Sequence, residues 1–180
     1  MTESTMLSLT ALPTDITGGL PLETSLNLID RTRYALVHGP GVSDYRHAIE
    51  LGCLKLSLAA ASLDARHHLL QGALLTLTYD CHMLLKTTCV NDAEKHSAEN
   101  ICRQVLSFLD KQANPPLPVT VAALWCLGRI LSVRDKHAEA AQVFERTAAV
   151  GRGLYGVTDA WVLEVQRLLA AAQAKAERRP

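Results

Sequence analysis

The stretch that decides the fold is ALWCLGRILSVRDKHAEAAQVFERT, residues 123–147. Apolar residues recur there at spacings of three and four on both sides of a short polar break, which is the period of an α-helix. A small residue on each side, Gly128 and Ala140, leaves room where two antiparallel helices would cross. The residues expected to fill the space around that crossing are Leu124, Leu127 and Phe144. The stretch therefore predicts a closely packed helical hairpin that turns at Asp135-Lys136.

The same hairpin resembles a tetratricopeptide repeat, a helix pair that stacks against further pairs. The residues that match the packing positions of the first helix are Leu124, Leu127, Gly128 and Leu131, and those of the second are Ala140, Phe144 and Thr147, where the family prefers Ala. The following segment, from Gly153 to Trp161, is longer than the family's usual link. It is similar to the 42-residue variety in kinesin light chains and in the C-terminal domains of SMYD-type methyltransferases. The resemblance implies stacked antiparallel hairpins forming a short α-solenoid.

The pattern repeats on both sides of this hairpin. A shift of about 42 residues toward the N-terminus aligns Ala98, Ile101 and Cys102 with packing positions of the second helix. The same shift aligns Cys81, Leu84, Leu85 and Thr88 with packing positions of the first helix. A shift of about 41 residues toward the C-terminus aligns Val165, Leu168, Leu169 and Ala172 with packing positions of the first helix. The resemblance is clearest over 120–176 and weaker over 66–112, and whether 22–62 belongs to the repeat stays open.

The whole chain predicts an all-α fold, because no segment alternates polar and β-branched residues as a strand would. About seven helices are expected, at 22–37, 44–62, 64–90, 93–112, 118–133, 137–151 and 159–176. Ser43, Asp64 and Asp92 are the expected caps of the second, third and fourth helices. The expected organisation is a flexible arm over 1–21, a single helical-repeat domain over 22–177, and a tail over 178–180.

Composition narrows the class of function. Lys plus Arg equals Asp plus Glu at 18 each, so the chain lacks the basic surplus typical of nucleic-acid binders. No uninterrupted apolar window is long enough to span a membrane, and the N-terminus carries no basic leader. The five cysteines are odd in number and widely spaced, which favours reduced, buried thiols. We therefore expect a cytoplasmic protein that does not bind nucleic acid and has no membrane-spanning segment.

No sequence motif points to catalysis, a cofactor or a metal. Strings typical of serine hydrolases, nucleotide-binding loops and zinc proteases are missing. The adjacent pairs His67-His68 and Cys81-His82 point about 100° apart on a helix, so neither pair can share one metal ion easily. We expect a protein that is not an enzyme, with no cofactor and no metal.

The resemblance implies that partners bind in a concave groove lined by the first helix of each pair. The residues expected to line that groove are Tyr79, His82, Lys86, Trp125, Arg129, Val133 and Gln166. Lys86 and Arg129, with His82 beside Trp125, would hold an extended acidic or C-terminal peptide. The alternative is that Trp125 belongs to the core and the two cations are merely solvated. The family's chaperone-tail clamp requires Lys and Asn where this chain has Trp125 and Arg129, so chaperone tails are not the expected ligand.

The first functional hypothesis is thus a non-catalytic adaptor or scaffold that binds a protein or peptide partner. The alternative is an accessory structural subunit of a large assembly, which would expose a wide apolar patch when isolated. A helical enzyme or metal-binding protein is the third reading.

Overall fold

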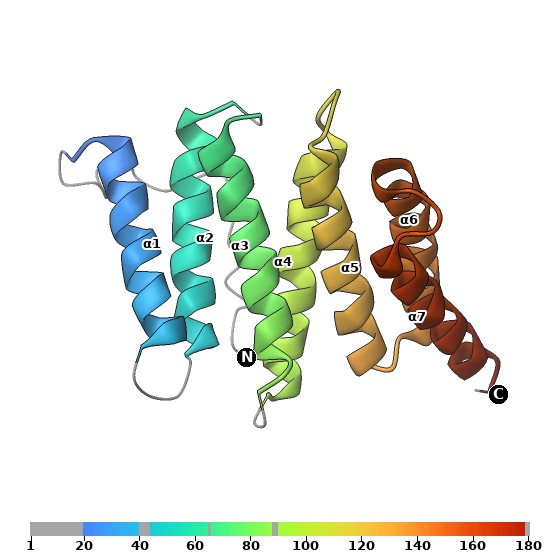
Figure 1. The fold of residues 1–180 in the computed structure, drawn as a ribbon. Helices are drawn as coiled ribbons and strands as arrows, with labels where there is room; N and C mark the ends of the chain where they lie inside the picture. Colours follow the sequence, from blue (N-terminus) through green and yellow to red (C-terminus); the bar gives the residue numbers. More distant parts are fainter. Residues whose placement is uncertain (1–19, 40–43, 65, 88–89, 179–180) are drawn as a thin grey trace. The chain divides into compact units, whose positions relative to one another are not determined.

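The computed structural model describes residues 20–39, 44–64, 66–87 and 90–178. These residues form seven α-helices and no strand (Figure 1). The helices are α1 (Leu22–His38), α2 (Tyr45–Ser62), α3 (His68–Leu84), α4 (Asp92–Asp110), α5 (Leu117–Val133), α6 (His137–Tyr155) and α7 (Ala160–Glu177). The predicted all-α class is confirmed. Residues 1–19 of the predicted arm and 179–180 of the predicted tail lie outside the described residues.

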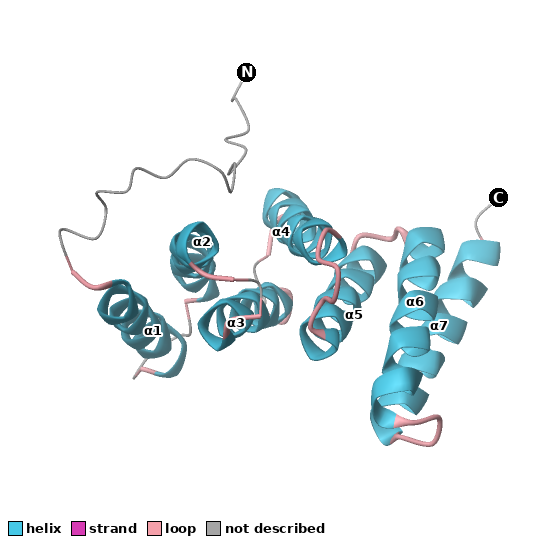
Figure 2. Cartoon of the chain, turned by 90° about the horizontal axis from the view of Figure 1, so that it is seen from above, coloured by secondary structure: helices cyan, strands magenta, loops and turns pink. Residues whose placement is uncertain are grey.

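The internal contacts divide the chain into two compact units, residues 1–73 and 74–180, and the division falls inside α3. In the first unit α1 packs against α2, and the nearly buried Lys55 of α2 forms an ion pair of 2.5 Å with Asp30 of α1. In the second unit α4 packs against α5, α5 against α6, and α6 against α7, each pair antiparallel (Figures 1 and 2). This succession is the predicted arrangement of a short helical solenoid. The single domain expected over 22–177 stays a prediction.

The crossing of α5 and α6 is built as the sequence predicts. A methyl group added to Gly128 would lie 2.6 Å from Cε1 of Phe144, so the Phe144 ring lies directly against the α5 backbone. Ala140 and Leu131 are fully buried beside it, and Leu124 and Leu127 are nearly so. The two small residues let the helices approach, and the large ones fill the space between them.

The link between α6 and α7 is shorter than predicted. The helix expected to end at 151 continues to Tyr155, so Gly153 lies inside α6 and the link is residues 156–159. Helix α7 docks closely, since a methyl group on Gly151 would lie 2.7 Å from the Trp161 ring. Helix α6 stops at Gly156, whose φ of 95° suits glycine and few other residues.

The third helix is also shorter than the predicted 64–90. Asp64 does not cap it, because its carboxylate accepts from the Arg66 amide in a turn that precedes α3. At the other end, the amides of Lys86 and Thr87 bond three residues back rather than four, which tightens the chain into a turn. The Leu84 carbonyl, which already accepts from the Thr87 amide, also accepts from the Thr87 hydroxyl.

Two other helix starts differ from the predicted caps by one residue. Asp44 caps α2 through the His47 amide, while the predicted cap Ser43 lies outside the described residues. Asn91, not Asp92, caps α4, and it forms a reciprocal capping box with Glu94.

The cysteines that the structure describes are free thiols, and most of them are buried. Cys81, Cys102 and Cys126 are buried free thiols and Cys53 is a half-buried one, while Cys89 lies outside the described residues. Among the described helices, none combines the length and the apolar character needed to cross a bilayer.

Candidate functional site

The most distinctive of the predicted groove positions form a cluster between α3 and α5. The His82 ring of α3 lies against the Trp125 ring of α5, with ring centroids 4.5 Å apart and planes inclined by 56°. His82 is only 4% exposed, whereas Trp125 is half-buried. Trp125 thus covers the imidazole and still presents part of its surface to solvent. It is therefore neither a fully buried core residue nor a fully exposed groove residue.

His82 is held in the neutral form. Burial is the main cause that lowers its pKa to about 4, and the positive charges of Lys86 and Arg129 contribute to the same decrease. Its Nδ1 atom is buried and has no hydrogen-bond partner among the described residues. A buried polar nitrogen without a partner is unusual and costs stability. The cluster therefore contains one polar atom that the fold itself leaves unsatisfied.

Lys86 and Arg129 give the cluster a positive charge that is not balanced locally. Lys86 is exposed at the end of α3, and Arg129 is half-buried one helical turn beyond Trp125. In the described part of the chain neither forms an ion pair with a carboxylate. We call His82, Lys86, Trp125 and Arg129 the α3–α5 surface. It combines an aromatic face with two cations, a combination suited to a segment carrying carboxylates.

The other three predicted groove residues are accessible but are not joined to this cluster. Tyr79 of α3 is 51% exposed and Val133 of α5 is 47% exposed, and Gln166 of α7 is half-buried. No described hydrogen bond or ring contact links any of them to His82 or Trp125. They extend the accessible area along α3, α5 and α7 without adding charge to it.

A second feature, a buried carboxylate surrounded by cations, ties α4 to the turn between α5 and α6. Glu99 is 2% exposed, and its carboxylate accepts hydrogen bonds from Arg103, Arg134 and Lys136. Burial alone raises the Glu99 pKa, but the hydrogen bonds from Lys136, Arg103 and Arg134 outweigh it and lower the pKa to about 2. Glu99 is therefore a structural anion.

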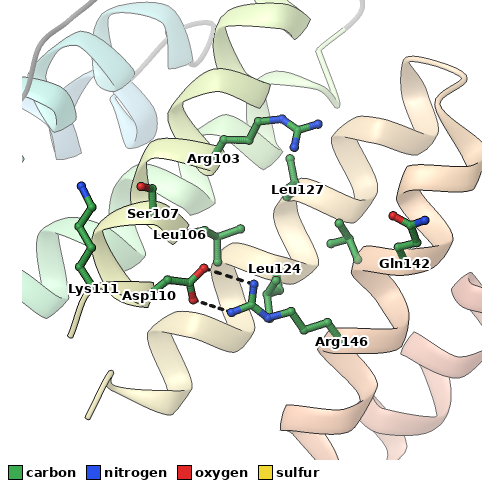
Figure 3. Close-up of a pocket in the computed structure, with 10 residues that line it drawn as sticks. Arg103, Leu106, Ser107, Asp110, Lys111, Leu124, Leu127, Gln142 and Arg146 are labelled. Carbon is green, nitrogen blue, oxygen red and sulfur yellow. Dashed lines mark hydrogen bonds and ion pairs between the residues drawn. The ribbon is translucent and has the colours of Figure 1, made fainter. Parts of the chain in front are cut away.

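A third feature is an open groove of about 540 Å³ between α4 and α6, with α5 at its floor (Figure 3). Buried leucines and a half-buried valine form the floor: Leu106, Leu124, Leu127 and Val143. Exposed polar residues form the walls: Arg103, Ser107, Asp110 and Lys111 on α4, and Gln142 and Arg146 on α6. We call this the α4–α6 groove.

Sequence reasoning missed both the carboxylate cluster and this groove. Glu99 could have been found, because it lies on the same helical stripe as Cys102, Leu106 and Leu109, where a charge must have a partner. The groove could not have been found in this way, because its walls are joined by ion pairs between residues 36 positions apart. The register of α4 against α6 that brings these residues together is visible only in the structure.

The described residues contain no cluster of potential metal ligands. Among the described residues, no three His, Cys, Asp or Glu side chains gather closely enough to hold an ion.

Comparison with protein-family models, with curated proteins and with solved structures found no match to this chain. The geometry of the two surfaces is thus the basis for any statement about function.

Proposed function

We propose that this protein is a non-catalytic adaptor that binds an acidic segment of a partner protein on the α3–α5 surface. The observation that carries the proposal is the cluster itself. A half-buried tryptophan lies over an imidazole with an unpaired Nδ1, beside two cations that have no carboxylate partner among the described residues. Tryptophan and arginine are the residues that most often dominate the binding energy of protein interfaces.

The partner's carboxylates would pair with Lys86 and Arg129, which have no carboxylate partner among the described residues. A carboxylate between Lys86 and Arg129 forms charge-assisted hydrogen bonds, which are about twice as strong as neutral ones. The exposed part of Trp125 offers an apolar contact to the side chain next to that carboxylate. Tyr79 and Val133 extend the contact area along α3 and α5.

The resemblance to tetratricopeptide repeats is part of the same proposal. It is supported by the close approach of Phe144 to Gly128 and by the complete burial of Ala140, the positions that carry the resemblance in the sequence. In repeats of that kind the first helices line the binding face, and in this proposal α3 and α5 are those first helices. A cytoplasmic location belongs to the proposal as well.

The test is an affinity capture from native extract with quantitative mass spectrometry. Wild-type protein is compared with a double variant, Trp125→Ala with Arg129→Glu, which removes the aromatic face and reverses one charge. The matched control is Val157→Ala with Arg152→Glu, which makes the same charge change at exposed positions of α6 and its following link.

We expect a defined set of partners to be lost from the double variant and retained by the control. Circular dichroism must show that both variants keep wild-type helix content. Partners that stay bound to the double variant would refute the assignment of this surface. Inseparable co-purification of all variants with one multi-subunit assembly would instead favour the structural-subunit alternative.

A further inference from the structure

The α4–α6 groove is enclosed at two levels by ion pairs that run from one helix to the other. Arg103 Nη2 donates to Glu139 Oε2 at 2.5 Å, and Arg146 Nη2 donates to Asp110 Oδ1 at 2.5 Å (the second pair is drawn in Figure 3). On each helix the two levels are seven residues apart, which corresponds to about 10 Å along the axis. Between them lies the apolar floor of Leu106, Leu124, Leu127 and Val143.

Both arginines that enclose the groove have donors left over. Arg146 uses Nη1 and Nη2 for Asp110, and its Nε makes no hydrogen bond to a described residue. Arg103 uses Nε and Nη2 for Glu99 and Glu139, and its Nη1 is likewise unused. A guanidinium carries five N–H donors, so each arginine can donate to a further carboxylate without losing those it already binds.

The charge of the lining also favours an anion. The groove is lined by three cations, Arg103, Lys111 and Arg146, and by the single anion Asp110. Lys111 makes no ion pair among the described residues. The groove thus offers an apolar floor between walls that carry one lysine without an ion pair among the described residues and two paired arginines with spare donors.

We propose that the α4–α6 groove is a second peptide-binding site, which takes an extended acidic segment with one apolar anchor. In an extended chain, residues two apart share a face and lie about 6.6 Å apart. An acidic residue two positions before the anchor and another two positions after it therefore span about 13 Å. That span lets one carboxylate reach Arg103 and the other reach Arg146 while the anchor enters the floor between them.

This site is independent of the α3–α5 surface, because the two use opposite sides of α5. At about 100° per residue, Leu127 points roughly 160° away from Trp125 around the helix axis. Trp125 belongs to the α3–α5 surface, and Leu127 forms the floor of the groove. One segment cannot occupy both, so a chain that binds at both sites joins two partner segments.

The experiment measures fluorescence anisotropy with three labelled eleven-residue peptides. The probe peptide places a glutamate two positions before and two positions after a central leucine, in an alanine and serine background. One control peptide has lysines in place of the glutamates, and the other has alanine in place of the leucine. Amide chemical shifts of the labelled full-length protein then locate the binding site.

Three variants make the test specific. Ser107→Trp places a bulky ring on the exposed wall of the groove and should weaken binding of the probe at least tenfold. Asp110→Asn removes the competing carboxylate from Arg146 and should tighten binding roughly two- to fivefold, the range expected for an exposed ion pair. Trp125→Ala with Arg129→Glu should leave binding unchanged.

The gain with Asp110→Asn cannot result from misfolding, so it separates a true site from a damaged fold. The proposal is overturned if the probe binds no better than its controls, if Ser107→Trp leaves its affinity unchanged, or if shifts map to Trp125 and Arg129. In that last case the proposed function stands and only the second site is lost. A concentration-dependent dimer that Ser107→Trp dissociates would also overturn it, because the occupant would then be another copy of the chain.

Discussion

Gly128 is the residue on which the approach of α6 to α5 depends. Replacing it with alanine would put a methyl carbon 2.6 Å from Cε1 of the Phe144 ring, well inside van der Waals contact. Overpacking of this kind costs about 1–3 kcal/mol. We predict that Gly128→Ala lowers the free energy of unfolding by that amount in urea denaturation.

A matched glycine provides the control for this prediction. Gly153 also lies in α6, and a methyl group there meets nothing within 4 Å. Gly153→Ala should stabilise the protein by about 0.5–1 kcal/mol, because alanine is the better helix former. Equal effects of the two substitutions would contradict the close crossing of α5 and α6.

Glu99 provides a prediction about a buried charge. We predict that Glu99→Gln destabilises the protein by about 1–3 kcal/mol, since three cations lose a common partner but remain partly accessible to water. Because the folded-state pKa of Glu99 is about 2 and its ordinary value is 4.5, its stabilising charge is present above pH 4.5 and is lost as pH falls toward 2. Unfolding midpoints measured between pH 5 and pH 2.5 should therefore fall less steeply in Glu99→Gln than in the wild type.

His82 acts in a different pH range. Its pKa is about 4 in the folded protein and 6.5 ordinarily, so the unfolded chain binds the extra proton first. Stability should fall as pH decreases from 6.5 toward 4, by roughly 2–3 kcal/mol at about 1.4 kcal/mol per pKa unit. His82→Phe keeps a ring against Trp125 and should remove this dependence, as measured by urea denaturation at pH 7.5 and pH 4.5. An unchanged pH dependence in this variant would show that His82 is not buried in the neutral form.

At the scale of the helices, the N-terminus of α4 shows how a side-chain capping interaction determines where a helix begins. Asn91 accepts from the Glu94 amide at 2.9 Å, and the Glu94 carboxylate accepts from the Asn91 amide at 2.9 Å. Asn91→Ala should cost about 1 kcal/mol of stability and leave peptide binding unchanged. Asp92→Ala, one residue later, should cost much less, because Asp92 is exposed and its one ion pair among the described residues is with Lys95. The reverse order of these two costs in thermal unfolding would contradict the assigned cap.

The helices themselves were largely predictable from the sequence, because each has an apolar stripe at spacings of three and four. Their ends were less so. The predicted third helix overran α3 at both ends, since turns at Asp64 and Thr87 compete locally with helix formation in ways that periodicity does not register. The predicted link after 151 failed for the opposite reason, because glycines at 151 and 153 are tolerated inside α6 where Trp161 packs against the first of them.

The candidate site was predictable only in part, because the spacing of residues along one helix does not show how two helices meet. The α3–α5 surface follows from helical phase, which places Trp125 and Arg129 on one side of α5. Contact between His82 and Trp125 depends on how α3 meets α5, and the ion pairs that enclose the α4–α6 groove depend on a register between helices. Neither is encoded in the spacing along one helix.

For the whole molecule, burial is unevenly distributed, and this predicts unequal local stability. Helix α5 has ten buried residues of seventeen, whereas α1 also has seventeen residues but only three buried ones, Ser25, Leu26 and Val37. Amide hydrogen exchange reports local opening, which is rarest where most surface is buried. We predict the slowest exchange in α5 and the adjoining half of α6, and exchange in α1 that is faster by at least an order of magnitude. Uniform protection along the chain would contradict this distribution.

Cross-linking from a single position can show whether a partner segment lies on the α3–α5 surface. A photoreactive amino acid replaces Tyr79, which is 51% exposed and lies three residues before His82 on α3, and in a control chain it replaces Val157, which is 64% exposed in the link after α6. We predict a cross-linked partner from position 79 that is absent from position 157 and disappears when Arg129→Glu is added. Cross-links of equal yield from both positions, or a yield at position 79 that Arg129→Glu leaves unchanged, would contradict it.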